Sequence, residues 1–278
     1  MQPHRRAVVV MKPPYNLHPD LIACHVEHHV LLGFERYLLY LTPESVDAVL
    51  GSHTLLPWIR SGMVVPVLWD MTESQPHLPA WGQRLIYTHA VLAHKAQHVH
   101  LFMPDFDEYL VATRPGLDTI ADMVRACAPP VTGAGPHASL QLQRRHVVAD
   151  APAGDGGASE AELLLQARAR GQHPLARHTR INLSSPPYIK SMVDPTQIML
   201  FFIHEAKAFN SRRVFDVDAG CMLLSHLPNL YAPRVAGASA LSHFRENPEW
   251  SGAVARLLHQ QAQWRQRLDP SLVVTQQP

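Results

Sequence analysis

The sequence has little net charge and no concentrated basic region. Lysine plus arginine number 24 and aspartate plus glutamate number 23, which leaves a formal net charge of +1. No general attraction to nucleic acid or to acidic membranes is therefore expected, and no nucleic-acid partner is predicted. No lysine or arginine cluster is interleaved with aromatic residues. The isolated pairs Arg144–Arg145 and Arg212–Arg213 are expected to be solvated.

Long apolar runs are also missing. No stretch approaches the roughly 20 apolar residues that span a bilayer. The run near the start, Ala7 to Met11, is too short for the core of a signal peptide. As written, the chain is expected to be soluble, or to be a catalytic domain whose N-terminal membrane anchor is missing from this sequence.

Cysteine is scarce. The three cysteines, Cys24, Cys127 and Cys221, lie far apart, and none forms a Cys-x-x-Cys pair. This argues against a zinc ribbon and against a disulfide framework, but it is compatible with a single disulfide bond. Cysteine usage therefore does not decide the redox compartment.

The chain nevertheless has the composition of a globular protein with a real core, with 46% hydrophobic and 17% charged residues in 278. Strand-like and helix-like segments alternate four times in its first part. This alternation predicts an α/β fold with a mainly parallel sheet and helices on both faces. The predicted strands are 7–11, 36–41, 63–69 and 99–103, and the predicted helices are 20–32, 44–60 and 81–97, the second with breaks at Gly51 and Pro57.

The second half is less regular. Expected elements are a strand at 139–148, a flexible loop at 149–158, a helix at 161–171, a buried strand at 198–203, a strand at 221–224 and a helix at 250–268. We expect a single domain, with a nucleotide-binding half at about 7–115, an acceptor half at about 116–250 and a C-terminal helix and tail at 251–278.

The segment after the fourth predicted strand is the most informative. Three carboxylates, Asp105, Asp107 and Glu108, stand within four positions. Alternation along an extended backbone places Asp105 and Asp107 on one side and Glu108 on the other. Two repelling carboxylates at a strand end favour a hard divalent cation such as Mn²⁺ or Mg²⁺, whose open positions take substrate phosphates. A solvated turn or a helix cap is the common alternative for a bare Asp-x-Asp, but the apolar runs on both sides argue against it.

Several ordered segments together resemble glycosyltransferase family 92. The segment from Cys24 to Tyr40 resembles the family's opening helix and strand, with His29 on the family histidine, and Phe102 to Leu110 resembles its carboxylate segment. The other matching segments are Gln83 with 87–92, 188–195, 203–204 and 242–245. The chain departs from the family pattern at Cys24–His25, at Leu41 and at Pro104.

This resemblance implies a GT-A-like, Rossmann-like fold that transfers a sugar, often galactose, from a UDP-sugar to a glycan with inversion and with Mn²⁺. It also implies a Golgi or endomembrane lumenal domain, with a membrane anchor as an option for the full-length form. Asp105 and Asp107 would hold the metal, with His243, His226 or His204 as a further ligand. Lys12, Gln83 and Lys190 are candidates for donor binding. Glu205 is the candidate base, with Asp216 and Asp218 as alternatives.

Two other functions stay open. A metal-dependent phosphohydrolase could use the same carboxylates, but it would need further ligands for a second metal at other strand ends. A catalytically degenerate, glycosyltransferase-like binding protein would fit the departures at Cys24 and Leu41. The group His25, Glu27, His28 and His29 lacks the His-Glu-x-x-His spacing, so helix packing is expected there instead of a metal site.

Overall fold

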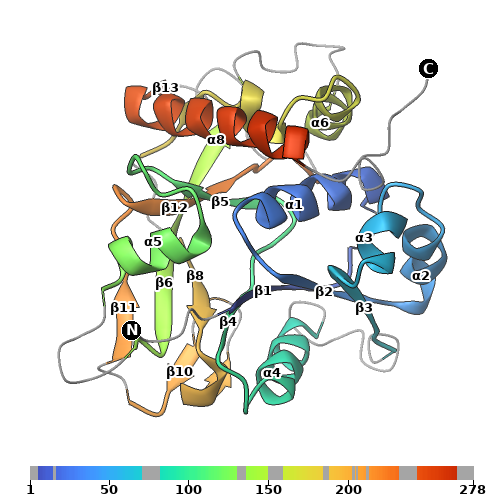
Figure 1. The fold of residues 1–278 in the computed structure, drawn as a ribbon, viewed down its shortest axis with the longest axis vertical. Helices are drawn as coiled ribbons and strands as arrows, with labels where there is room; N and C mark the ends of the chain where they lie inside the picture. The colour runs from blue at the N-terminus through green and yellow to red at the C-terminus, as the bar shows by residue number, and fades with distance from the viewer. Residues whose placement is uncertain are drawn as a thin grey trace.

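The computed structural model describes residues 6–14, 17–70, 82–129, 136–149, 159–183, 188–201, 204, 206–210, 213–231 and 243–267. Within these residues, eleven strands form one mixed sheet, and helices lie against both of its faces (Figure 1). A separate two-stranded sheet lies beside it. The mixed α/β architecture is the one that the sequence predicts.

The first half alternates strands and helices as expected. Its elements are β1 (Arg6–Met11), α1 (Pro19–Leu31), β2 (Arg36–Leu41), α2 (Pro43–Leu50), α3 (Leu56–Arg60), β3 (Val64–Leu68), α4 (Gln83–Ala93) and β4 (Val99–Phe102). The strands pair in parallel in the order β4-β1-β2-β3. The predicted helix at 44–60 is interrupted at Gly51, between α2 and α3, but the predicted break at Pro57 is wrong, because this proline lies in the first turn of α3. Strand β3 lies at the sheet edge, where Pro66 can be accommodated.

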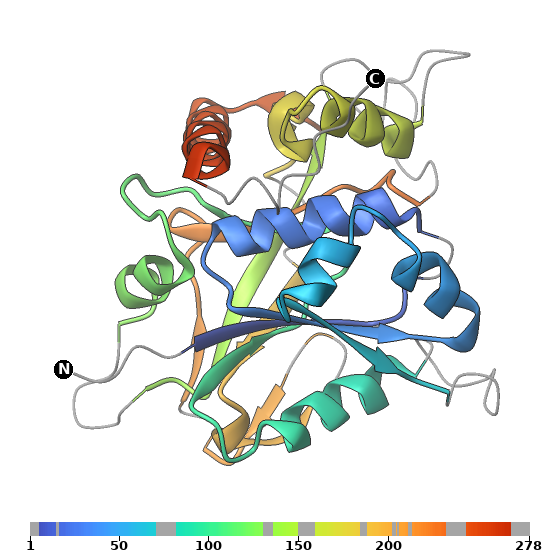
Figure 2. The same cartoon turned by 45° about the vertical axis from the view of Figure 1, so that its right-hand side comes forward.

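Two hydrophobic clusters cover the two faces of these strands. Alternate residues of β1 divide between them, since Val9 and Met11 pack on the α1 side and Val8 and Val10 on the α4 side. Figure 2 shows α1 on one side of the sheet and α4 on the other. Helix α1 ends at Leu31 and is followed by Gly33, whose φ of 85° lies in the left-handed region that glycine tolerates best. The parallel half is thus buried on both faces, as its continuous apolar strands require.

The second half extends the same sheet. Its elements are β5 (Glu108–Ala112), α5 (Ile120–Cys127), β6 (Ser139–Val148), α6 (Glu160–Ala169), β7 (Arg180–Ile181), β8 (Tyr188–Val193), β9 (Ile198–Phe201), β10 (Ala206–Ala208), β11 (Val214–Asp216), β12 (Met222–His226), β13 (Arg245–Glu246) and α8 (Pro248–Arg267). Short 3₁₀ turns cover Pro174–Arg177 and Pro195–Gln197. Strand β8 lies antiparallel between β4 and β6 and joins the two halves.

Several expectations for this half are confirmed and two need comment. The strand at 139–148 and the helices near 161–171 and 250–268 are present as β6, α6 and α8. The predicted buried strand at 198–203 is wrong as to burial. Its described part, β9, pairs with β10 in the separate sheet and exposes Met199 and Leu200. The predicted loop at 149–158 lies, apart from Ala149, outside the described residues.

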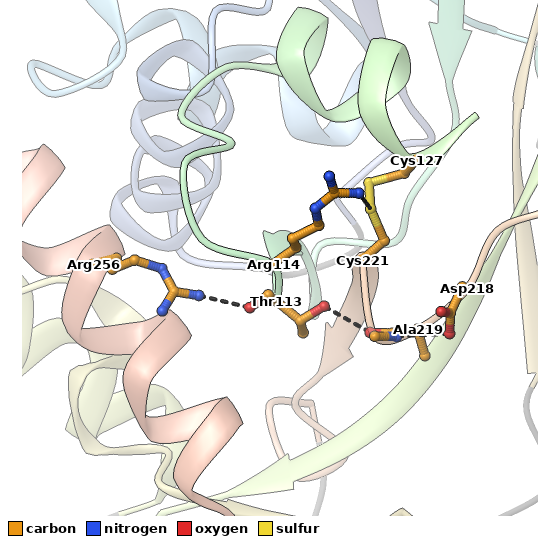
Figure 3. The surroundings of a disulfide bond; sticks show 8 residues. Thr113, Arg114, Cys127, Asp218, Ala219, Cys221 and Arg256 are labelled. Carbon is orange, nitrogen blue, oxygen red and sulfur yellow. Dashed lines mark hydrogen bonds between the residues drawn. A yellow bond between two sulfur atoms is a disulfide. The ribbon is translucent and has the colours of Figure 1, made fainter. Parts of the chain in front are cut away.

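One disulfide joins Cys127 at the end of α5 to Cys221 just before β12 (Figure 3). The two cysteines are 94 residues apart in sequence. Around the bridge, the Thr113 hydroxyl donates to the Ala219 carbonyl at 2.7 Å, and Arg256 of α8 donates to the Thr113 carbonyl at 2.7 Å. The bridge therefore fixes the start of β12, the strand whose far end carries His226. Cys24 is free and buried.

The histidines of α1 tie this helix to β5. The Nε2 atoms of His25 and His28 donate to the carbonyls of Glu108 and Leu110, each at 2.8 Å. The remaining nitrogens also have partners, since His25 Nδ1 accepts from the Tyr37 hydroxyl at 2.8 Å and His28 Nδ1 pairs with His173 Nε2 at 2.9 Å. These histidines thus serve helix packing and set the position of the strand that begins at Glu108.

Acidification is expected to destabilise this packing. Burial lowers the pKa of His25 to about 3 and that of His28 to about 4, from an ordinary value near 6.5. Between these values the unfolded chain binds more protons than the folded chain, so stability is lost as pH falls below 6.5. Lowering the pH from 6.5 to 5.5 should reduce the free energy of unfolding by about 2 kcal/mol from the two histidines together. Urea unfolding at each pH measures this.

A variant series assigns the effect. Burial also lowers the pKa of His29, so His28→Gln should remove only the share of His28, about a third of the contribution of these three histidines. His53→Gln, which alters an exposed histidine, should leave it unchanged. A pH dependence that is the same in wild type and His28→Gln would contradict the assignment.

Candidate active site

The three carboxylates gather in a turn that follows β4. The Glu108 N–H donates to the Asp105 carbonyl at 2.9 Å, and the Asp105 N–H donates to Glu108 Oε2 at 2.8 Å. One oxygen from each of Asp105, Asp107 and Glu108 lies within 4.8 Å of the others. The prediction that Glu108 points away from its neighbours is therefore wrong. It assumed an extended backbone, whereas residues 105–108 form a turn, in which alternation does not apply.

Asp105 is held between two lysines. Lys12, just after β1, lies 2.8 Å from Oδ1, and Lys190 of β8 lies 2.8 Å from Oδ2. Gln83, at the start of α4, approaches Oδ1 at 3.5 Å and donates to the Tyr87 hydroxyl at 2.5 Å. Burial alone would raise the pKa of Asp105, but the charges of Lys190 and Lys12 hold it well below its usual range. All three predicted donor-binding residues thus meet at Asp105.

Lys190 is a fully buried cation that depends on its carboxylate neighbours. It also lies 3.6 Å from Glu108 Oε2. Burial disfavours the ammonium, yet the charges of Glu108 and Asp105 raise the pKa of Lys190 above its ordinary value. Burial raises the pKa of Glu108, and Lys190 opposes this. The charges in this part of the site are consequently interdependent.

Asp107 has different neighbours. Its Oδ2 is 3.1 Å from Nε2 of His226, at the end of β12, and both side chains are buried. Asp107 Oδ1 and His226 Nδ1 have no hydrogen-bond partner among the described residues, although both atoms are buried. The ring of His146 on β6 packs against that of His226 with the centroids 4.7 Å apart. Of the three carboxylates, Asp107 is therefore the one with an uncommitted oxygen.

The prediction that Arg144 and Arg145 are solvated is wrong for Arg144. Its side chain is only 14% exposed, and Nη1 donates to Glu108 Oε1 at 3.2 Å. Arg145 Nη1 donates to the Leu183 carbonyl at 3.0 Å. A usable signal was present in the sequence, because alternation along 139–148 places Arg144 on the same side as Leu140 and Leu142, which are buried.

The other candidate ligands and bases lie in less central positions. His204 lies near Lys190, Asp105 and Arg144, and desolvation together with the charge of Lys190 lowers its pKa. His243 is exposed in a turn just before β13. Asp216 pairs with Gln141 near the start of β6, whereas His226 pairs with His146 near its end. Asp218 precedes β12, whose opposite end carries His226. Both aspartates therefore lie away from the carboxylates. Glu205 lies outside the described residues.

Tyr231 was not singled out from the sequence, yet it borders the site. Burial of its hydroxyl, followed by the charges of Asp107 and Asp105, raises the pKa of Tyr231 above its ordinary value. The hydroxyl therefore stays protonated near neutral pH and can act as a hydrogen-bond donor. The residue follows β12 only five positions after His226, but no local pattern marks it.

These residues fit a divalent cation at Asp107. Carboxylate oxygens are the preferred ligands of Mg²⁺ and Mn²⁺, and imidazole nitrogen is compatible with Mn²⁺. A buried carboxylate oxygen without a donor is costly unless something else satisfies it. The unpartnered Asp107 Oδ1 beside His226 meets that description.

The comparison with known families settles the relationship. The model of glycosyltransferase family 92 matches residues 5–255, which covers both halves of the sheet. The chain belongs to glycosyltransferase family 92. Its large, mostly parallel central sheet with flanking helices is consistent with a GT-A-like fold.

Two further findings concern relatives and membrane spans. No curated protein gives a significant sequence match to the chain. Within the described residues, no helix has both the length and the apolar character needed to cross a membrane.

Proposed function

We propose that this family 92 member transfers a sugar from a UDP-sugar to a glycan acceptor, with galactose as the favoured sugar. The transfer inverts the anomeric configuration and requires Mn²⁺ or Mg²⁺. Family membership supports glycosyl transfer in general. The observation that carries the finer proposal is the buried Asp107 Oδ1, which has no partner and lies in a group of three carboxylates. The carboxyl end of a parallel strand, where this group lies, is where open α/β sheets bind nucleotides.

In this proposal Asp107 and His226 hold the cation, and Asp105 contributes when a lysine releases it. His243 and His204 remain alternatives to His226, but neither has a described contact with Asp107. When bound, the cation would neutralise negative charge on the donor diphosphate as UDP departs. Lys12 can also contribute, because its side chain is 22% exposed whereas that of Lys190 is 1% exposed. Lys12 would shift from Asp105 to a donor phosphate while Lys190 keeps Asp105 ionised and in place.

The remaining residues orient the reactants. Gln83 reaches Asp105 from the start of α4, next to the donor. Tyr231 can donate a hydrogen bond toward a leaving or attacking oxygen near Asp107. Inversion requires a carboxylate that accepts the proton of the acceptor hydroxyl. Glu205 is the candidate for that role. It follows His204, whose electrostatic neighbours are Lys190, Asp105 and Arg144.

The disulfide bears on location. Disulfides persist mainly in oxidising compartments such as the endomembrane lumen. The Cys127–Cys221 bridge therefore supports the proposal of a lumenal domain, in the Golgi by family resemblance.

The phosphohydrolase alternative finds less support. A second metal would need ligands at other strand ends, and among the described residues the acidic, histidine and cysteine side chains that could share an ion form a single group. A degenerate binding protein is the stronger alternative. The charged site is intact, with Lys12, Asp105 and Lys190 in direct contact, and this favours a working enzyme.

Titration calorimetry with UDP tests the proposal. We expect UDP to bind in Mn²⁺ or Mg²⁺ and to bind at least about 100-fold more weakly after chelation by EDTA, because the cation would neutralise most of the charge of the diphosphate. GDP serves as the control nucleotide. Transfer from UDP-galactose to water or to a glycan, detected as released UDP, then separates an enzyme from a binder. Absence of UDP binding with either metal would overturn the proposal.

A further inference from the structure

The registers of four neighbouring strands place several polar side chains on one face of the sheet, next to the buried Leu224 and Leu110. On one row, Glu108 of β5 pairs with His226 of β12, which pairs with His146 of β6. On the next row, Arg144 of β6 pairs with Tyr188 of β8. Directly paired residues lie on the same face of a sheet. Polar and aromatic side chains from these strands therefore share the face that carries Glu108.

Tyr188 lies on this face beside the carboxylates. Tyr188 and Lys190 are two residues apart on β8, so they point to the same side, roughly 7 Å from each other along the strand. Lys190 contacts Asp105 directly. Arg144 provides a second connection, because it donates to Glu108 and its guanidinium carbon lies 4.6 Å from the centroid of the Tyr188 ring. Tyr188 is thus connected to the carboxylates through two neighbouring side chains, Lys190 and Arg144.

The ring is exposed and yet held in place. Tyr188 is 56% exposed, whereas Arg144, which covers part of its ring, is mostly buried. A cation over a ring face attracts the ring and restricts its motion. An exposed aromatic residue that is already ordered loses little conformational entropy on binding, which suits a contact surface.

The chemistry of such a surface fits a sugar ring. One face of a pyranose carries weakly positive C–H groups, which complement the negative face of an aromatic ring. Its hydroxyls need hydrogen-bond partners, and Arg144 and His146 lie on the same face of the sheet. A nucleobase could stack on tyrosine as well. However, Tyr188 lies on the β6 side of Asp105, whereas Lys12 and the parallel strand ends lie on the β1 side.

We propose that Tyr188, held by Arg144, is the stacking platform for the acceptor sugar. This inference rests on the proposed glycosyl transfer and adds the acceptor side of the same site. It predicts a pyranoside as the ligand that contacts Tyr188 and places the donor nucleotide elsewhere.

Ligand-observed NMR with methyl glycosides of galactose, glucose and N-acetylglucosamine tests the platform. Binding is measured in the presence of UDP and Mn²⁺, and again without them. We expect wild type to bind at least one glycoside, Tyr188→Ala to weaken that binding roughly 10-fold, and Tyr188→Phe to retain it. The Kd for UDP should be the same in all three proteins.

Phe209 offers a matched control. It is 65% exposed, and Lys95 Nζ lies 4.6 Å from its ring centroid, but it belongs to the separate β9–β10 region. Phe209→Ala should leave glycoside binding unchanged. Equal binding by wild type and Tyr188→Ala, or no glycoside binding by wild type, would overturn the platform. Loss of UDP binding in Tyr188→Ala would assign the ring to the donor instead. Failure of wild type to bind UDP would contradict the proposed function. In that case the glycoside measurement without UDP still tests whether Tyr188 binds a sugar.

Discussion

Replacing Asp107 by asparagine is expected to lower sugar transfer by at least about 1000-fold, because a neutral amide would hold the cation that neutralises the leaving diphosphate far more weakly. Asparagine keeps the size of the side chain and can still hydrogen-bond to His226, which lies 3.1 Å from Oδ2. The fold should therefore survive while the metal-dependent part of UDP binding is lost. Released UDP measured at saturating donor, together with calorimetry in Mn²⁺, gives both quantities.

The control for this variant is Asp216→Asn. Asp216 is an exposed aspartate on β11, away from the carboxylate group. It should keep wild-type turnover and UDP affinity. If Asp107→Asn retained turnover within about tenfold of wild type, the reaction would not depend on a cation held by the Asp107 carboxylate.

Replacing Lys190 by methionine is expected to reduce the free energy of unfolding by about 3–5 kcal/mol. Methionine fills most of the space but removes a buried positive charge that lies 2.8 Å from Asp105 and 3.6 Å from Glu108. Two carboxylates would then remain in a buried site with less positive charge to balance them. Urea unfolding at pH 7 measures the loss.

Two further variants separate this mechanism from a packing effect. Adding Glu108→Gln to Lys190→Met removes one of the two uncompensated carboxylates, so the double variant should regain part of the lost stability. Lys12→Met should cost less, because the Lys12 side chain is partly exposed and water can solvate Asp105 from that side. A cost below about 1 kcal/mol for Lys190→Met would mean that the charges compensate in another way.

Much of the parallel half could be predicted from local pattern. Apolar runs such as Ala7–Met11, followed by helical periodicity and by Gly33, gave the order of strands and helices correctly. The position of Lys12 after β1 and of the carboxylates after β4 followed from chain order and from the parallel topology. The ordered family motifs also indicated a relationship that the match over residues 5–255 confirms.

The internal arrangement of the site could not be predicted in this way. The expectation for Glu108 failed because alternation assumes an extended chain, and hydrogen bonds between residues 105 and 108 form a turn there. Alternation along 139–148 places Arg144 on the side of Leu140 and Leu142, but it does not identify Glu108, 36 positions away, as its partner. Similarly, three scattered cysteines left open whether any pair would meet, and the fold joins Cys127 to Cys221.

The sequence by itself determined the class of fold, the alternation of strands and helices along the first half of the chain, and the presence of a carboxylate group at a strand end. These features follow from local periodicity and from residues that are neighbours in the chain. The tertiary structure alone decided which carboxylate has a free oxygen, which lysines neutralise Asp105, and that Tyr188 stands beside them. The contacts of Lys190 and Tyr188 depend on the insertion of β8 between β4 and β6, and the contact of His226 depends on the pairing of β12 with β5. Local pattern cannot specify such pairings, because they are set by how both faces of the completed sheet are buried.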